Sequence, residues 1–168
     1  FDFTGYDVEG GELPSDPNEA DGWLITGSKH GAYENHPWIP PLENFIRAVH
    51  AKGQPMIGVC FGHQIIAKAL GGTVAKFHGG WSTGRQRYEI DGRDYQINAW
   101  HQDQVTKPPP GAQIVGHSAF CQNAAMIIDG HVLTVQPHPE LDAEAIEFLI
   151  DNRGPGVVPD ALLAEART

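Results

Sequence analysis

Apolar residues in the first half of the chain fall into short continuous runs, and each run is followed by a helical pattern. Residues 21–26 and 55–60 are short, largely apolar runs of the length that is typical of buried strands. Residues 40–52 and 61–70 place apolar side chains at helical spacing, and glycine follows both segments. Strand, helix, strand and helix in this order predict βαβ units with parallel strands.

The second half of the chain predicts antiparallel strands instead. Asp91-Gly92 and Asp129-Gly130 each separate two strand-like runs, and Asp-Gly is a strong signal for a tight hairpin turn. Further helices are expected at about 142–150 and, more weakly, at 161–166. The pattern therefore predicts an α/β fold whose open, mixed and mostly parallel sheet is flanked by helices and extended by antiparallel hairpins.

The amino-acid composition limits which binding partners and which cellular compartment we expect for the protein. The 168 residues include 11 Lys and Arg against 21 Asp and Glu, a formal net charge of −10. Because nucleic acids and anionic membranes repel an acidic surface, we expect neither as a partner. No run approaches the ~20 apolar residues of a membrane helix. The two cysteines, Cys60 and Cys121, form no CxxC pair and no disulfide framework, so we expect a cytoplasmic protein.

Cys60 is the first candidate for chemistry. It is the centre of Gly-Val-Cys-Phe-Gly at 58–62, where a predicted strand turns into a predicted helix. This is the spacing of a nucleophile elbow, in which small residues on either side permit a sharp turn. The helix N-terminus would lower the pKa of the thiol, and the Phe61 N–H would point at a developing oxyanion. The alternative is a structural cysteine at the end of a core strand.

His138 and Glu140 are the second candidate. They lie in Gln-Pro-His-Pro-Glu at 136–140, directly after an apolar run. In an extended segment, side chains two residues apart project to the same side. A carboxylate beside a histidine fixes its tautomer and stabilises the imidazolium, as a general base requires. The alternative is a solvated loop histidine beside an unrelated acid, but together with the elbow the pattern favours a Cys–His–Glu triad.

The two motifs, at 58–64 and 136–140, resemble those of the class I, triad-type glutamine amidotransferases, in particular small stand-alone members such as γ-glutamyl peptidases. The family fold is an open α/β sheet of the flavodoxin type. The resemblance implies a nucleophile at Cys60, a general base and acid at His138 and its orienting partner at Glu140. It also implies oxyanion N–H groups from Gly27 and Phe61.

The resemblance extends to the segment 100–105, which is placed like the family's substrate-binding segment. It implies glutamine-binding positions at Gln64, Gln102 and Asp103, while His101 either lines the pocket or caps a turn. The implied reaction is hydrolysis of the γ-amide of glutamine or of a γ-glutamyl compound through a glutamyl thioester, with no metal or organic cofactor. We expect residues 1–168 to be a single domain that lacks the family's first strand and helix and its natural C-terminal end.

Two other functions stay open beside this one. The chain could be a glutaminase subunit that is active only with a partner synthetase, which consumes the ammonia. It could also be a non-enzymatic redox or binding domain on the same fold, which would need the reactive cysteine but not the pair His138 and Glu140.

Several other residues invite weaker predictions. The nine histidines include no HxxxH or HxH pair, so we expect no metal site. His63, next to the elbow, is expected to pack or to form a hydrogen bond, and Cys121 to be a quiet, semi-buried thiol. The glycine-rich segment 79–84 lacks the lysine and spacing of a phosphate loop, and is expected to be a turn or a flexible rim of the active site.

Overall fold

The computed structural model describes residues 1–167, which form nine strands, four α-helices and one short 3-10 helix. In chain order the elements are η1 (Pro17–Glu19), β1 (Trp23–Ile25), α1 (Ile39–Ala51), β2 (Met56–Val59), α2 (Phe61–Ala69), β3 (Thr73–Lys76), β4 (Ser82–Ile90), β5 (Arg93–His101), β6 (Asp103–Lys107), β7 (Ala112–His117), β8 (Ala125–Ile128), β9 (Val132–Val135), α3 (Ala143–Asn152) and α4 (Asp160–Ala166).

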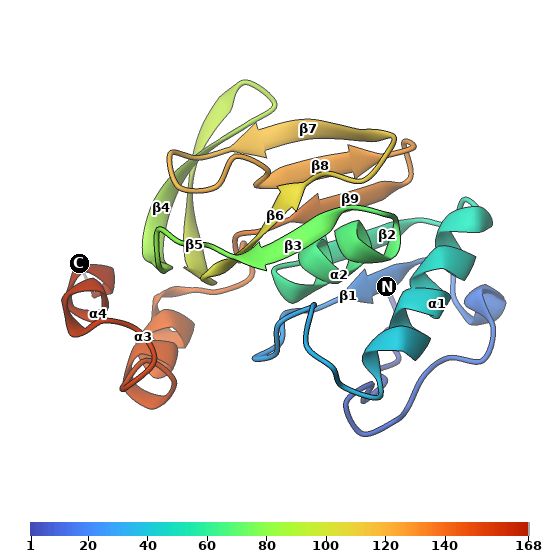
Figure 1. Cartoon of the computed structure of the whole chain (residues 1–168), viewed down its shortest axis with the longest axis horizontal. Helices are drawn as coiled ribbons and strands as arrows, with labels where there is room; N and C mark the ends of the chain where they lie inside the picture. The colour runs from blue at the N-terminus through green and yellow to red at the C-terminus, as the bar shows by residue number, and fades with distance from the viewer. Residues whose placement is uncertain (168) are drawn as a thin grey trace.

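Seven strands form one sheet in the order β1-β2-β9-β8-β7-β4-β5, and β3 pairs with β6 in a separate two-stranded sheet (Figure 1). The mixed α/β fold is confirmed, but fewer strands are parallel than expected. Among the strands of residues 1–167, only the pairings of β1 with β2 and of β2 with β9 are parallel. The other four pairings are antiparallel, and two of them, β4 with β5 and β8 with β9, are joined by tight hairpin turns that reverse the chain, whereas a parallel pair needs a long crossover.

Both predicted Asp-Gly hairpins are present. Asp91 and Gly92 have φ angles of 51° and 69°, and Asp129 and Gly130 have 49° and 75°. Positive φ at both central residues is typical of a type I′ turn, whose twist matches that of the flanking strands. The first hairpin aligns β4 with β5 over their full length, so the start of β4 lies beside the end of β5.

Helices α1 and α2 cover one face of the three parallel strands. Leu42, Ile46 and Val49 of α1 are buried, as is nearly every residue of α2. They belong to a single apolar core with the inward side chains of β2 and β9, including Met56 and Val132. This burial fixes the end of β2, and with it the start of α2, in one position.

The opposite face of the same three strands carries an exposed apolar row. Leu24, Ile57 and Leu133 are neighbours in the strand register, and they are 51%, 45% and 42% exposed. The row follows from the alternation of side chains along each strand, since the residues on either side of it point into the core.

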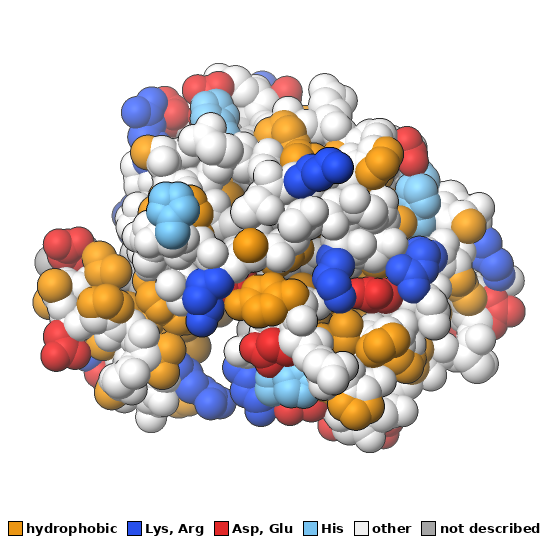
Figure 2. Space-filling model, in the orientation of Figure 1, with side chains coloured by type: hydrophobic (Ala, Val, Ile, Leu, Met, Phe, Trp, Pro, Cys, Tyr) orange, Lys and Arg blue, Asp and Glu red, His pale blue; other side chains and the backbone are white. Residues whose placement is uncertain are grey.

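Helices α3 and α4 form a second, smaller cluster with Trp81 and Trp100. Figure 1 shows the pair beneath the β4–β5 hairpin, at the end of the molecule far from α1, and Figure 2 shows a notch between this pair and the main body. Among the described residues, no helix combines the length and apolar character needed to cross a bilayer.

Candidate active site

Cys60 lies at a sharp turn between β2 and α2. Its φ of 52° and ψ of −103° fall outside the regions that a residue with a side chain normally occupies. The flanking glycines permit this turn. A Cβ at Gly62 would lie 2.0 Å from the Ile25 carbonyl oxygen, and a Cβ at Gly58 would lie 2.6 Å from the Gly62 backbone. The strand-to-helix elbow predicted from the sequence is therefore present.

His138 and Glu140 face each other after β9. His138 Nδ1 lies 2.7 Å from Glu140 Oε1; His138 is 9% exposed and the Glu140 side chain 50%. The main chain fixes the histidine, because its N–H donates to the Asn98 carbonyl at 2.8 Å, and Asn98 Nδ2 donates to the Leu141 carbonyl at 2.8 Å. A carboxylate that accepts the Nδ1–H leaves Nε2 with a free lone pair, as a general base requires.

Gly27, in the loop after β1, is the point at which Cys60 and His138 meet. The position that a Cβ of Gly27 would occupy lies 3.1 Å from His138 Cε1, 4.0 Å from His138 Nε2 and 3.8 Å from Cys60 Cβ. Three segments that are distant in sequence therefore converge on one small volume. The glycine leaves this volume open, since any side chain would press on the imidazole.

The charge state of Cys60 differs from the sequence-based expectation. Burial raises the pKa of the thiol to about 12, and the charges of Glu140 and Asp103 add to the rise. The Phe61 N–H, at the start of α2, and the Gln136 side chain act in the opposite direction. The expectation of a lowered pKa is wrong here because burial outweighs the helix N-terminus. The thiol holds its proton at neutral pH.

Gln64 is buried beneath the elbow rather than facing an open pocket. Its Nε2 donates to the Asp103 carbonyl at 2.9 Å and to Gln136 Oε1 at 3.1 Å. These two bonds use the amide hydrogens, so the side chain ties α2 to the β5–β6 bend and to the segment after β9. Its predicted contact with a substrate stays a prediction and would have to involve Oε1.

The other predicted substrate positions lie at the bend between β5 and β6. Burial lowers the pKa of His101 to about 4, so its ring is neutral, and its Nδ1 lies 3.3 Å from the Asp103 carbonyl. Asp103 is partly buried, which raises its pKa, and its Oδ1 accepts a hydrogen bond from Tyr33 Oη at 3.2 Å. Gln102 is also partly exposed, and its carbonyl accepts the Phe77 N–H.

Two residues join this region that the sequence reasoning missed. Gln136 is fully buried, bonds to Gln64 and lowers the thiol pKa of Cys60, as described above. A polar residue at the end of an apolar strand could have indicated it. Tyr33 reaches Asp103 across 70 positions of sequence, and no local pattern indicates that contact.

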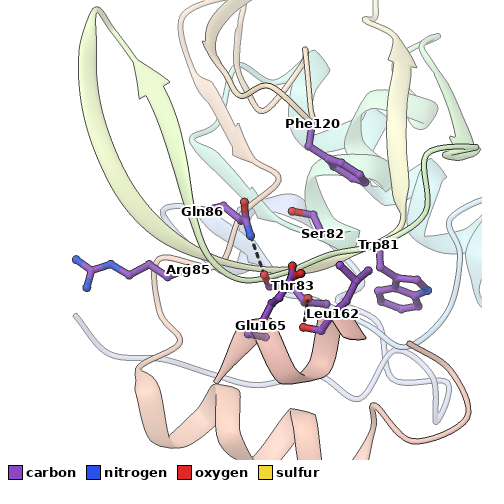
Figure 3. A pocket seen from close by; sticks show the side chains of 9 residues that line it. Trp81, Ser82, Thr83, Arg85, Gln86, Phe120, Leu162 and Glu165 are labelled. Atoms are coloured by element: carbon purple, nitrogen blue, oxygen red, sulfur yellow. Dashed lines mark hydrogen bonds between the residues drawn. The ribbon is translucent and has the colours of Figure 1, made fainter. Parts of the chain in front are cut away.

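A cavity of about 280 Å³ lies between the start of β4 and α4 (Figure 3). Figure 3 shows Trp81, Phe120 and Leu162 around it. The segment 79–84 is only in part the turn that we expected, since its last three residues are the first three of β4. Two of these, Ser82 and Thr83, line the cavity. None of the predicted site residues lines it, but Ser82 pairs in register with His101, so one wall is a single strand away from the predicted substrate positions.

The prediction that His63 packs or forms a hydrogen bond is confirmed, whereas the prediction of a semi-buried Cys121 is wrong. His63 is fully buried with Nδ1 2.8 Å from Thr134 Oγ1, and burial lowers its pKa to about 3. Cys121 is more deeply buried than expected, and burial raises its thiol pKa to about 12. Its backbone N–H donates to Ser118 Oγ.

Within residues 1–167, one group of side chains has an arrangement that suits a metal ion. Atoms of His30, Glu34 and His36 all lie within 4.8 Å of one another. The sequence analysis missed this group because His30 and His36 are six residues apart and so form neither an HxH nor an HxxxH pair. The third side chain is Glu34, which lies between them in sequence.

The chain is similar to several known proteins. Residues 13–151 match the family model of glutamine amidotransferase class-I. Gamma-glutamyl peptidase 2 of Arabidopsis thaliana is 31% identical over 155 residues, which cover 84% of this chain and 62% of that protein. A glutamine-hydrolyzing GMP synthase subunit of Sulfurisphaera tokodaii is 34% identical over 121 residues, which cover 66% of this chain and 64% of that protein.

A similar solved structure is that of a glutamine amidotransferase from Methylobacillus flagellatus. It superimposes with a TM-score of 0.79 at 28% identity and covers 89% of this chain and 66% of that chain. The chain thus spans less than two thirds of the length of the two curated relatives, at 62% and 64%.

Proposed function

Because the chain belongs to the class-I glutamine amidotransferase family, we propose that it hydrolyses the γ-amide of glutamine or of a γ-glutamyl compound. The products are glutamate and either ammonia or an amine. The convergence of Cys60 and His138 at Gly27, with Glu140 bonded to the far nitrogen of the imidazole, is the observation that carries the proposal. In this proposal Cys60 is the nucleophile, His138 the base and Glu140 the orienting carboxylate, which is the order that a triad needs.

The first half of the reaction forms a thioester. As the sulfur of Cys60 attacks the amide carbon, its proton passes to His138 Nε2. The backbone N–H groups of Phe61 and Gly27 then bind the oxyanion, and one well-placed donor contributes about 3 kcal/mol. The C–N bond breaks, the proton on His138 moves to the leaving nitrogen, and the glutamyl group stays on sulfur.

The second half of the reaction hydrolyses that thioester. His138 Nε2 takes a proton from water as the water oxygen attacks the carbonyl carbon, and the sulfur leaves with the proton restored. The partly buried carboxylate of Asp103, oriented by Tyr33, suits the α-amino group of the substrate, because a charge-assisted hydrogen bond is strong at such a site. The chemistry uses side chains and main-chain N–H groups of this chain.

The test is glutamate release from glutamine and from γ-glutamyl dipeptides, followed by a coupled assay. The wild type is compared with Cys60→Ala, and Cys121→Ala is the matched control because that thiol is also buried and also has a raised pKa. We expect release by the wild type and the control and none by Cys60→Ala. Release that persists in Cys60→Ala would refute the proposal.

A second candidate function is a glutaminase subunit that works only with a partner synthetase. The raised thiol pKa of Cys60 is compatible with this candidate, as it is with the first, since in both a protonated thiol gives its proton to His138 when it attacks. The GMP synthase relative is itself named as one subunit of an enzyme. Silence on both substrates, combined with rapid alkylation of Cys60 by a glutamine analogue, would support this candidate. The same raised pKa disfavours a redox sensor, which needs an accessible thiolate.

A further inference from the structure

The loop between β1 and α1 brings together three side chains that could bind a metal ion, and this group is separate from Cys60. His30 Nδ1 lies 3.2 Å from Glu34 Oε2, and His36 Nε2 lies 2.6 Å from the same oxygen. The three side chains are 18%, 40% and 32% exposed, so that a dissolved ion can reach them. Two imidazole nitrogens and one carboxylate oxygen are a donor set that Zn²⁺ prefers.

The outer atoms of two of these side chains already have partners. His30 Nε2 lies 3.1 Å from Glu9 Oε1, and Glu34 Oε1 accepts the Gly31 N–H at 2.9 Å. A carboxylate on the far nitrogen of a histidine is the usual support of a metal ligand, because it fixes the tautomer and leaves the near nitrogen with a lone pair. His30 Nδ1 and Glu34 Oε2 are thereby held 3.2 Å apart.

The ring of His30 is placed between two carboxylates. Both of its nitrogens lie within hydrogen-bond distance of a carboxylate oxygen, Nδ1 at 3.2 Å from Glu34 and Nε2 at 3.1 Å from Glu9. A dication between His30, Glu34 and His36 accepts the lone pairs of the two inner nitrogens and neutralises the carboxylate directly. Trp38 stacks on the His36 ring, with centroids 5.6 Å apart and planes 9° apart, and so restricts its orientation.

We propose that His30, Glu34 and His36 bind one Zn²⁺ ion, with water as the fourth ligand. The 3.2 Å between His30 Nδ1 and Glu34 Oε2 is close to the edge of a tetrahedron with metal bonds of about 2.0 Å, which is about 3.3 Å. The contact of His36 has to widen by about 0.7 Å, a small movement for a side chain on a loop.

Zinc at this position would also fix the loop that carries Tyr33. Tyr33 lies between the ligands in sequence, and its hydroxyl group donates to Asp103. The ion therefore links the surface of the loop to the bend between β5 and β6.

The experiment is calorimetric titration of the metal-free chain with ZnCl₂. All variants carry Cys60→Ala, so that the thiol cannot bind the ion. His36→Gln removes a ligand and Glu9→Gln removes the support of His30. The matched control is His50→Gln, since His50 also pairs with a carboxylate, that of Asp129, on another part of the surface.

We expect one Zn²⁺ per chain in the parent and in the His50→Gln control. His36→Gln and Glu9→Gln should each weaken binding about tenfold or more, as loss of a ligand or of its supporting carboxylate does elsewhere. Circular dichroism checks that each variant is folded. The absence of zinc uptake, or uptake that His36→Gln leaves unchanged, would overturn the proposal whatever the outcome of the glutamate assay.

Discussion

Replacing Gly62 with alanine tests whether the elbow depends on the close approach of α2 to β1. Gly62 is the second residue of α2, and helix preference alone would make alanine about 1 kcal/mol more favourable there. The new Cβ, however, would lie 2.0 Å from the Ile25 carbonyl oxygen and 2.8 Å from the carbonyl carbon. Both are backbone atoms, so no side chain can rotate away. Such overpacking costs about 3 kcal/mol, which leaves a net destabilisation of about 2 kcal/mol.

Thermal unfolding followed by circular dichroism measures this effect. For a domain of this length each kcal/mol shifts the Tm by about 2–4 °C, so the Tm of Gly62→Ala should fall by about 4–8 °C. Gly5→Ala is the matched control, because nothing lies within 4 Å of a Cβ at that position. A Tm that rises in Gly62→Ala, as helix preference alone requires, would refute the close approach and the reasoning built on it.

Three further predictions concern the histidines. Glu140→Gln should lower kcat for glutamate release about tenfold, because the glutamine carbonyl can still accept the Nδ1–H while the half-exposed charge is lost; an unchanged kcat would contradict this. Gly27→Ala should slow the same reaction strongly with little change in Tm, since its Cβ would lie 3.1 Å from His138 Cε1, and full activity would count against the convergence. Burial lowers the pKa of His63 and His101 to about 3 and 4, so below about pH 6.5 the unfolded chain binds protons that the folded chain does not. The Tm should therefore decrease from pH 6.5 toward pH 4, and a constant Tm across that interval would show that these rings are not held neutral.

The elements that could be predicted are those whose start, end or turn is marked by residues close together in the sequence. Helices α1 and α2 and both Asp-Gly hairpins follow from glycine, proline and apolar spacing, which act over a few residues. The pairing of β3 with β6, and the limit of the parallel region to three strands, did not follow. Pairing between distant strands depends on how the whole chain packs, and no local period encodes it.

The candidate site divides in the same way. The spacing around Cys60 predicted the elbow, and the i, i+2 spacing of His138 and Glu140 predicted their contact, because both depend on neighbouring residues. The thiol pKa could not be predicted, since it depends on what other elements pack around the sulfur. The contacts of Gln64 with Asp103 and Gln136 likewise arise only when α2, β6 and the segment after β9 meet.

The exposed row of Leu24, Ile57 and Leu133 should lower the colloidal stability of the protein at high concentration. These side chains are about half exposed and lie on adjacent strands, so together they form an apolar stripe that copies of the chain present to one another. Because sulfate strengthens apolar association, we expect the chain to precipitate at a lower ammonium sulfate concentration than a variant without this row. Threonine has the β-branched shape that strands favour, and threonine at all three positions should raise the precipitating salt concentration while leaving the buried face intact.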